Sequence, residues 1–113
     1  MNFNFEWGLY KNDDNIDKLR KNILIFKNKY DTKINRLHRH RIYFRFGNLM
    51  SELTEMYMDA QKLGFEKLST ICRKLVNYIK KNINRNDYFI WNYIDREIKL
   101  INRLYQMSLQ YLT

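Results

Sequence analysis

The spacing of apolar residues between Ile42 and Leu63 is the feature that most constrains the fold of this chain. Apolar side chains recur there at alternating intervals of four and three residues. A helix with this spacing keeps one apolar stripe on a single side, where it packs against a partner. We therefore expect a long amphipathic helix with a buried stripe of Ile42, Phe46, Leu49, Leu53, Met56, Ala60 and Leu63.

Three further segments carry the same spacing, so the sequence predicts four helices, over about 14–30, 33–63, 66–82 and 88–111. Asp13-Asp14-Asn15, and Asn86 or Asp87, are suited to cap helix N-termini, and Gly64 is suited to end a helix. Asp31-Thr32 either caps a new helix or lies inside one long helix, and the sequence leaves both open. The expected stripes are Ile16, Leu19, Ile23, Phe26 and Tyr30, then Phe65, Leu68, Cys72, Leu75 and Ile79, then Trp91, Ile94, Ile98, Ile101, Tyr105 and Leu112.

These elements predict an all-α single domain, residues 1–113, built as an antiparallel four-helix bundle with an N-terminal aromatic arm. The absence of proline and the small number of glycines, three, favour long uninterrupted helices. Apolar and polar residues alternate over the arm, 1–12, which is typical of extended chain. The arm either docks its aromatic residues on its own bundle or reaches a neighbouring subunit.

The location of the protein is predicted from its cysteine content and its apolar runs. The single cysteine, Cys72, excludes an intramolecular disulfide framework and fits a reducing compartment. The N-terminus lacks the basic and apolar blocks of a signal peptide, and no apolar run is long enough to span a bilayer. We therefore expect a cytoplasmic protein with no membrane association.

The positive charge is concentrated in two blocks. The formal net charge is +9, and residues 18–45 carry ten Lys or Arg against one Asp. Residues 67–85 carry six more cations and no acid, and the acidic segment 46–66 separates the two blocks. A molecule polarised in this way favours an anionic partner, either a nucleic acid (DNA or RNA) or an acidic protein surface.

Residues 33–45, KINRLHRHRIYFR, combine arginines with two neighbouring aromatic residues. Cations grip a phosphate backbone while aromatic rings stack on bases, so the segment is suited to nucleic-acid binding. The alternative is a solvated helix end in which arginine stems cover the rings. The predicted phosphate contacts are Lys18, Lys21, Lys27, Arg36, Arg39, Arg41 and Arg45, with Lys80, Lys81 and Arg85 as a second patch, and the stacking candidates are Tyr43 and Phe44.

No catalytic or metal-binding motif is evident, so we expect a non-catalytic protein without a metal or cofactor. His38 and His40 are two residues apart, which on a helix places them on nearly opposite faces, as surface or interface residues. Cys72 lies on an apolar stripe and is expected to be a buried, inert thiol. Glu52, Glu55 and Asp59 are interpreted as a solvated helix face, because the Glu-x-x-His motif of di-metal bundles is missing.

One resemblance lies in residues 39–65. Ser51-Glu52-Leu53, Ala60 and Leu63-Gly64-Phe65 resemble a pattern of the 23S rRNA intervening-sequence proteins, a four-helix-bundle family that includes the accessory variability determinants of diversity-generating retroelements. Residues 101–104, Ile-Asn-Arg-Leu, are similar to Ile-Gly-Arg-Met in the last helix of the retroelement proteins, although the following Gly-Gly pair is absent. The resemblance implies an oligomeric basic bundle that binds nucleic acid and a partner polymerase without catalysis of its own.

A second resemblance is to the histidine phosphotransfer domain. Leu63-Gly64, Leu68, Cys72 and Leu75 are similar to the Leu-Gly, Leu, Cys, Leu spacing of that family. Thr54 stands where the phosphorylated histidine would be, so this resemblance implies docking to a receiver domain without phosphotransfer.

Three functional hypotheses therefore follow from the sequence. The leading one is a basic helical bundle that binds nucleic acid, as an accessory subunit of a nucleic-acid-processing complex. The second is a protein-interaction module or inhibitor that docks an acidic protein surface. The third is a structural homo-oligomer whose basic faces line subunit contacts.

Overall fold

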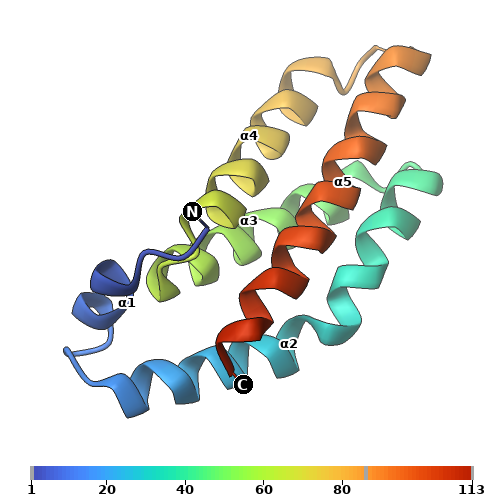
Figure 1. Ribbon diagram of the computed structural model, residues 1–113. Helices are drawn as coiled ribbons and strands as arrows, with labels where there is room; N and C mark the ends of the chain where they lie inside the picture. Colours follow the sequence, from blue (N-terminus) through green and yellow to red (C-terminus); the bar gives the residue numbers. More distant parts are fainter. Residues whose placement is uncertain (1, 86, 113) are drawn as a thin grey trace.

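The computed structural model describes residues 2–85 and 87–112, and over these residues the protein is all-helical, as the sequence predicts (Figure 1). The helices are α1 (Phe5–Lys11), α2 (Ile16–Ile42), α3 (Phe46–Leu63), α4 (Glu66–Asn82) and α5 (Tyr88–Ser108), followed by the short 3-10 helix η1 (Leu109–Leu112). The described part of the chain thus has five α-helices where the sequence predicts four. No helix within it is both long and apolar enough to cross a membrane.

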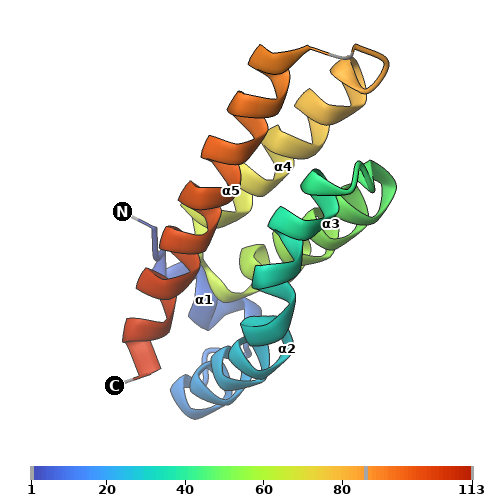
Figure 2. The same ribbon diagram turned by 90° about the vertical axis from the view of Figure 1, so that its right-hand side faces the viewer.

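The four long helices lie side by side in an elongated molecule of 47 × 23 × 20 Å (Figures 1 and 2). α3 packs against α2 and α4, and α5 packs against α4 and α2, so each long helix has two long neighbours. The connections between α2 and α3 and between α3 and α4 are two to three residues long, which forces consecutive helices to reverse direction. α1 packs beside the end of α3 and the start of α2.

The predicted apolar stripes form the core, with exceptions at their ends. Every stripe residue of α4 is buried, as are Leu49, Leu53, Met56, Ala60 and Leu63 of α3. Phe46, Trp91 and Leu112 are only partly buried but pack against the core. Ile16 and Ile42 are about half exposed, so their prediction as core residues is wrong. These two residues lie at the two ends of α2.

The predicted helix over 33–63 is wrong, because the chain breaks at 43–45 and residues 33–42 belong to α2. Asp31 caps no helix: it lies inside α2, where its side chain accepts a hydrogen bond from the Tyr105 hydroxyl at 2.7 Å. The two apolar stripes are out of phase, since Leu37 and Ile42 are five residues apart instead of three or four. The break lets the buried apolar residues of α2, which end at Leu37, and those of α3, which begin at Leu49, face the same core, and it leaves Ile42 exposed.

The expected extended arm is also wrong, because residues 5–11 form α1. Asn4 caps this helix, since its side chain accepts a hydrogen bond from the Trp7 backbone nitrogen at 3.0 Å. The segment docks on its own chain, which was one of the two alternatives. Phe3 packs against Phe65 and Tyr111, and the Trp7 indole donates a hydrogen bond to the Gln61 carbonyl oxygen at 2.8 Å.

Candidate functional site

The connections α2–α3 and α4–α5 lie at the same end of the molecule and expose aromatic side chains there. The Phe44 ring meets Trp91 edge to face, with ring centroids 5.4 Å apart, so the α2–α3 connection contacts the first turn of α5. The α4–α5 connection projects beyond the α2–α3 connection (Figure 2). We call this surface the aromatic end and define it by its exposed apolar side chains, Ile42, Tyr43, Phe44, Ile83, Tyr88 and Phe89.

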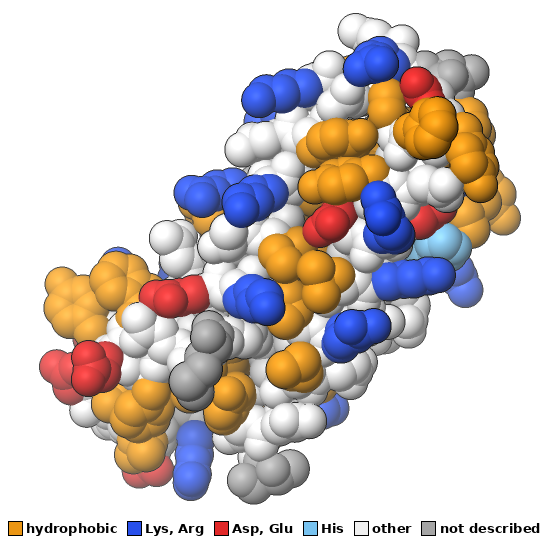
Figure 3. Space-filling view, turned by 45° about the horizontal axis from the view of Figure 1, so that its top comes forward, with side chains coloured by type: hydrophobic (Ala, Val, Ile, Leu, Met, Phe, Trp, Pro, Cys, Tyr) orange, Lys and Arg blue, Asp and Glu red, His pale blue; other side chains and the backbone are white. Residues whose placement is uncertain are grey.

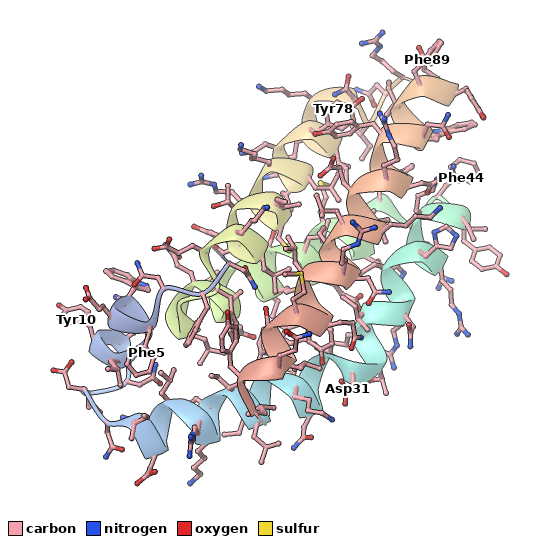
Figure 4. All side chains as sticks on the ribbon, viewed as in Figure 1. Phe5, Tyr10, Asp31, Phe44, Tyr78 and Phe89 are labelled. Atoms are coloured by element: carbon pink, nitrogen blue, oxygen red, sulfur yellow. The ribbon has the colours of Figure 1, made fainter. Side chains whose placement is uncertain are left out.

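The rings of the aromatic end point away from the core. Figure 4 shows Phe44 and Phe89 at this end, from the α2–α3 connection and the start of α5. Tyr43 is 65% exposed and Phe89 is 79% exposed. Figure 3 shows hydrophobic side chains gathered at this end with Lys and Arg among them. This end therefore offers exposed apolar surface, a feature that protein contact sites often share.

The backbone at Phe44 is in the left-handed region, with φ of 55°. This conformation costs a bulky residue about 1–2 kcal/mol, and it tends to persist at functional positions. The strained residue holds its ring against Trp91, although 55% of the Phe44 side chain remains in solvent. Phe44 is therefore placed by the fold, and it is available to a ligand.

Most of the predicted phosphate contacts lie near the aromatic end. Arg36 and Arg39 are exposed on the last turns of α2, and Arg45 lies with its guanidinium 5.2 Å from the centre of the Tyr43 ring. The second patch, Lys80, Lys81 and Arg85, adjoins the same end, because it occupies the last turn of α4 and the α4–α5 connection.

Other predicted contacts are engaged within the protein or lie elsewhere. Arg41 forms an ion pair with Asp95 of α5 at 2.9 Å, and its guanidinium lies 5.6 Å from the centre of the Trp91 ring. Lys27 pairs with Asp31 at 2.8 Å, and Lys18 pairs with Asp13. Lys18, Lys21 and Lys27 belong to the first half of α2, roughly 24–38 Å along the helix from the α2–α3 connection at about 1.5 Å per residue.

The carboxylates of α3 do not form a solvated face, so that prediction is wrong. They lie along the seam with α2, where Glu55 contacts Lys33 at 2.9 Å and Asp59 contacts Lys29 at 2.7 Å. Hydrogen bonds from Lys33 and Lys29 lower the pKa of Glu55, and the hydrogen bond to Asp59 raises the pKa of Lys29. The sequence could have indicated this seam, because a basic helix and an acidic helix are consecutive.

The two histidines point to different neighbours. His40 is buried with its Nε2 atom 3.2 Å from Glu52 of α3, whereas His38 is exposed with its Nδ1 atom 3.9 Å from Asp95 of α5. They therefore join α2 to two different helices. In residues 2–85 and 87–112, no group of three or more His, Cys, Asp or Glu side chains is placed to hold a metal ion.

Cys72 is fully buried in α4, as the stripe predicts, and burial raises the pKa of its thiol to about 12. Such a thiol stays protonated at neutral pH and is a poor nucleophile.

Sequence reasoning missed Tyr88, Phe89 and Ile83 as parts of the site. Tyr88 and Phe89 follow the loop directly, and they precede Ile90, which is the buried residue that continues the stripe four positions before Ile94. Extending the stripe back by one turn would have shown that Tyr88 and Phe89 lie outside it. The juxtaposition with Tyr43 and Phe44 depends on how the helices pack, and no sequence signal indicates it.

Comparison of the chain with family models, curated proteins and solved structures found no match. The aromatic end offers exposed rings for stacking, guanidinium and ammonium groups for anions, and an apolar surface for a protein.

Proposed function

We propose that the protein binds single-stranded nucleic acid at the aromatic end and acts without catalysis. The observation that carries the proposal is the proximity of exposed Tyr43 and Phe44 to arginines that form no ion pair with any described residue. Aromatic rings stack on unpaired bases of any sequence, whereas the bases of a duplex are already stacked on one another. A single strand, DNA or RNA, fits such a surface better than a duplex.

Five cations at this end support the proposal because no described carboxylate compensates them, whereas Arg85 lies 4.0 Å from Asp87. Arg36, Arg39, Arg45, Lys80 and Lys81 form no ion pair with any described residue, whereas the cations along the α2–α3 seam face carboxylates. An unpaired surface cation is free to replace the counterions of a phosphate backbone. Arg41 has a structural role instead of a phosphate contact, since its ion pair with Asp95 fixes the end of α2 against α5.

The scaffold of the proposed interface is an antiparallel four-helix bundle of α2–α5. α1 packs on α2 and α3 at the end remote from the site. Its kinship with the intervening-sequence and retroelement accessory proteins stays a prediction, as do its cytoplasmic location and its role as an accessory subunit. Each of these would agree with a basic bundle that presents a binding surface.

The experiment is a binding titration of the purified full chain against labelled single- and double-stranded DNA and RNA at low and moderate salt. We expect the single strands to bind more tightly than the duplexes, with an affinity that falls steeply with salt. Replacing both Arg39 and Arg45 with Glu should weaken binding by about tenfold or more, which corresponds to roughly 1.4 kcal/mol. Replacing Tyr43 and Phe44 with Ala should weaken binding at both salt concentrations, because stacking contributes about 1–3 kcal/mol per base.

The matched control is the double variant Lys67→Glu/Lys74→Glu, which makes the same charge change on the exposed face of α4. It should retain most of the affinity. An affinity that does not change with salt, or an equal loss in the control and the Arg39/Arg45 variant, would contradict the proposed site.

A protein partner is the second candidate, and the exposure of Tyr88 and Phe89 favours it. Tyr88 is 67% exposed and Phe89 is 79% exposed, and aromatic residues of this kind often anchor protein interfaces. This candidate predicts no binding to nucleic acid at low salt and a one-to-one complex with an acidic protein. Light scattering on the titrated sample would test the third candidate, a homo-oligomer.

A further inference from the structure

A second candidate binding site lies at the opposite end of the molecule, where α1, the first half of α2 and the last turn of α3 meet (Figure 1). These elements line a cavity of about 380 Å³ that is open to solvent. Four lysines line it, Lys11 from α1, Lys18 and Lys29 from α2, and Lys62 from α3. We call this cavity the lysine pocket. It shares no residue with the aromatic end.

From this pocket we infer a binding site for a phosphate monoester of nucleotide size. The inference goes beyond the proposed function, because it concerns a separate site. Ligand pockets in proteins measure about 300–1,000 Å³, so the volume suits a nucleotide. Lysine ammonium groups bind phosphate as point charges, and several of them converge here from three different elements.

The charge of the pocket is positive and partly uncompensated. Among the described residues, Asp59 is the only acid that lines it, against four lysines, and Lys29 contacts both Asp59 at 2.7 Å and Glu55 at 3.1 Å. Lys18 pairs with Asp13, which lies in the turn between α1 and α2. Lys11 and Lys62 form no ion pair with any described residue, so a bound anion would supply the partner that these two lysines lack.

The Lys11 ammonium is held in place by aromatic rings. It lies 4.9 Å from the centre of the Trp7 ring and 5.9 Å from the centre of the Tyr10 ring. This contact limits the range of positions of the Lys11 side chain. Less side-chain entropy is therefore lost when Lys11 binds a ligand.

The wall around the pocket is built by tertiary hydrogen bonds and is therefore already formed without a ligand. The buried Asn12 amide donates to the Gly8 carbonyl oxygen at 2.7 Å and to the Lys62 carbonyl oxygen at 3.2 Å. The Asn22 amide donates to the Asn12 side-chain oxygen at 2.5 Å. These bonds hold α1, α2 and α3 together, and preorganisation of this kind strengthens binding.

The rest of the lining is apolar and can cover the part of the ligand that carries no charge. Ile25, Phe26 and Leu63 contribute this surface. Ile25 is 52% exposed, which is a large fraction for an isoleucine in the middle of a helix. The combination of an apolar surface with lysines and two asparagines fits a nucleotide better than inorganic phosphate, which would leave the apolar part unused.

Two sources supply the same chemistry, a free nucleotide and the terminal phosphate of a nucleic-acid strand. Isothermal titration of the full chain with AMP, with adenosine and with a short oligonucleotide, with and without a terminal phosphate, distinguishes them. Saturable binding of AMP identifies the free nucleotide. Binding that requires the terminal phosphate of the oligonucleotide, with none of AMP, identifies the strand end.

The matched variants are Lys62→Ala, which removes an unpaired lysine of the pocket, and Lys67→Ala, which removes an exposed unpaired lysine of α4. We expect Lys62→Ala to weaken binding of the phosphorylated ligand about tenfold and Lys67→Ala to leave it unchanged. Thermal melting should show that both variants stay folded. The Arg39→Glu/Arg45→Glu variant should bind AMP normally, which separates this test from that of the aromatic end.

Three results would overturn the inference. The first is that neither AMP nor the phosphorylated oligonucleotide binds saturably at low salt. The second is that adenosine binds as tightly as AMP, because the lysines would then contribute nothing. The third is that Lys67→Ala weakens binding as much as Lys62→Ala, which would indicate a diffuse charge effect.

Discussion

The side-chain amide of Asn2 donates a hydrogen bond to the Ser108 hydroxyl oxygen at 2.7 Å, and this bond joins residues 106 positions apart. The side-chain oxygen of Asn2 accepts a hydrogen bond from the backbone nitrogen of Leu68, in the first turn of α4, at 2.9 Å. The start of the chain thus ties the beginning of α4 to the end of α5. Both Asn2 and Ser108 are buried, so neither group can turn to water instead.

Replacing Asn2 with Ala should lower the free energy of unfolding by about 1–3 kcal/mol, because it leaves buried polar groups of Ser108 and Leu68 without this partner. Urea unfolding followed by circular dichroism measures the effect. The control is Asn92→Ala, at an exposed position of α5, which should change stability little. Equal stability of the Asn2 variant and the native protein would mean that the N-terminal segment does not hold the bundle together.

Replacing Gly8 with Ala should destabilise the protein by about 1–3 kcal/mol, as overpacking of a close contact usually does. A Cβ atom at this position would lie 2.7 Å from the Leu63 carbonyl oxygen, which belongs to the rigid backbone of α3. Gly47→Ala is the control, because a Cβ atom there has no neighbour within 4 Å. The control should be neutral or stabilised by up to about 1 kcal/mol, since alanine favours helix. Urea unfolding followed by circular dichroism compares the two variants. A loss of stability in the Gly47 variant but not in the Gly8 variant would contradict the close contact.

The left-handed backbone of residue 44 should reverse the usual order of alanine and glycine. Phe44→Ala and Phe44→Gly both lose the contact with Trp91, but only alanine keeps the strain of a positive φ. We expect the glycine variant to be more stable than the alanine variant by about 0.5–1 kcal/mol. At Asn28, an exposed position of α2, the same two substitutions should show the ordinary order, with alanine more stable. Alanine as the more stable residue at both positions would be inconsistent with a left-handed residue 44.

Acid should destabilise the protein through two hydrogen-bonded carboxylates, Asp31 of α2 and Glu55 of α3. The pKa of Asp31 is lowered from 3.8 by hydrogen bonds from Lys27 and Tyr105, and that of Glu55 is lowered from 4.5 by hydrogen bonds from Lys33 and Lys29. A group with a lowered pKa in the folded state binds protons more readily when unfolded. Its contribution is therefore complete above the unfolded pKa and is lost as the pH falls through the folded pKa.

Thermal melts between about pH 6 and about pH 2 should thus show a falling melting temperature, with most of the loss below about pH 4.5. The double variant Asp31→Asn/Glu55→Gln should be less stable than the native protein at about pH 6 and should lose less stability on acidification. Parallel pH profiles for the two proteins would show that these carboxylates do not contribute.

The main features of the helices follow from local rules, because apolar spacing and capping act over a few residues. The α4 boundaries at 66 and 82 match the prediction, since Gly64 ends α3 in the left-handed conformation with φ of 87°. The break at 43–45 could have been found by the same reasoning, because Leu37 and Ile42 are out of phase. The sequence did not indicate the short helix α1, because Phe3, Phe5 and Trp7 stand at every second position, which is the apolar spacing of a strand.

The sequence by itself determined the helical class, the buried stripes of α3 and α4, the burial of Cys72 and the excess of positive charge. Only the tertiary structure decided which charges are free. Arg39 and Arg41 are two residues apart, yet Arg39 is exposed without an acidic partner whereas Arg41 pairs with Asp95, which lies 54 positions later in the chain. The contact of Phe44 with Trp91 and the convergence of Lys11, Lys18, Lys29 and Lys62 on one pocket were decided in the same way. Periodicity sets which face of a helix is buried, but the neighbour of an exposed side chain depends on how whole helices pack.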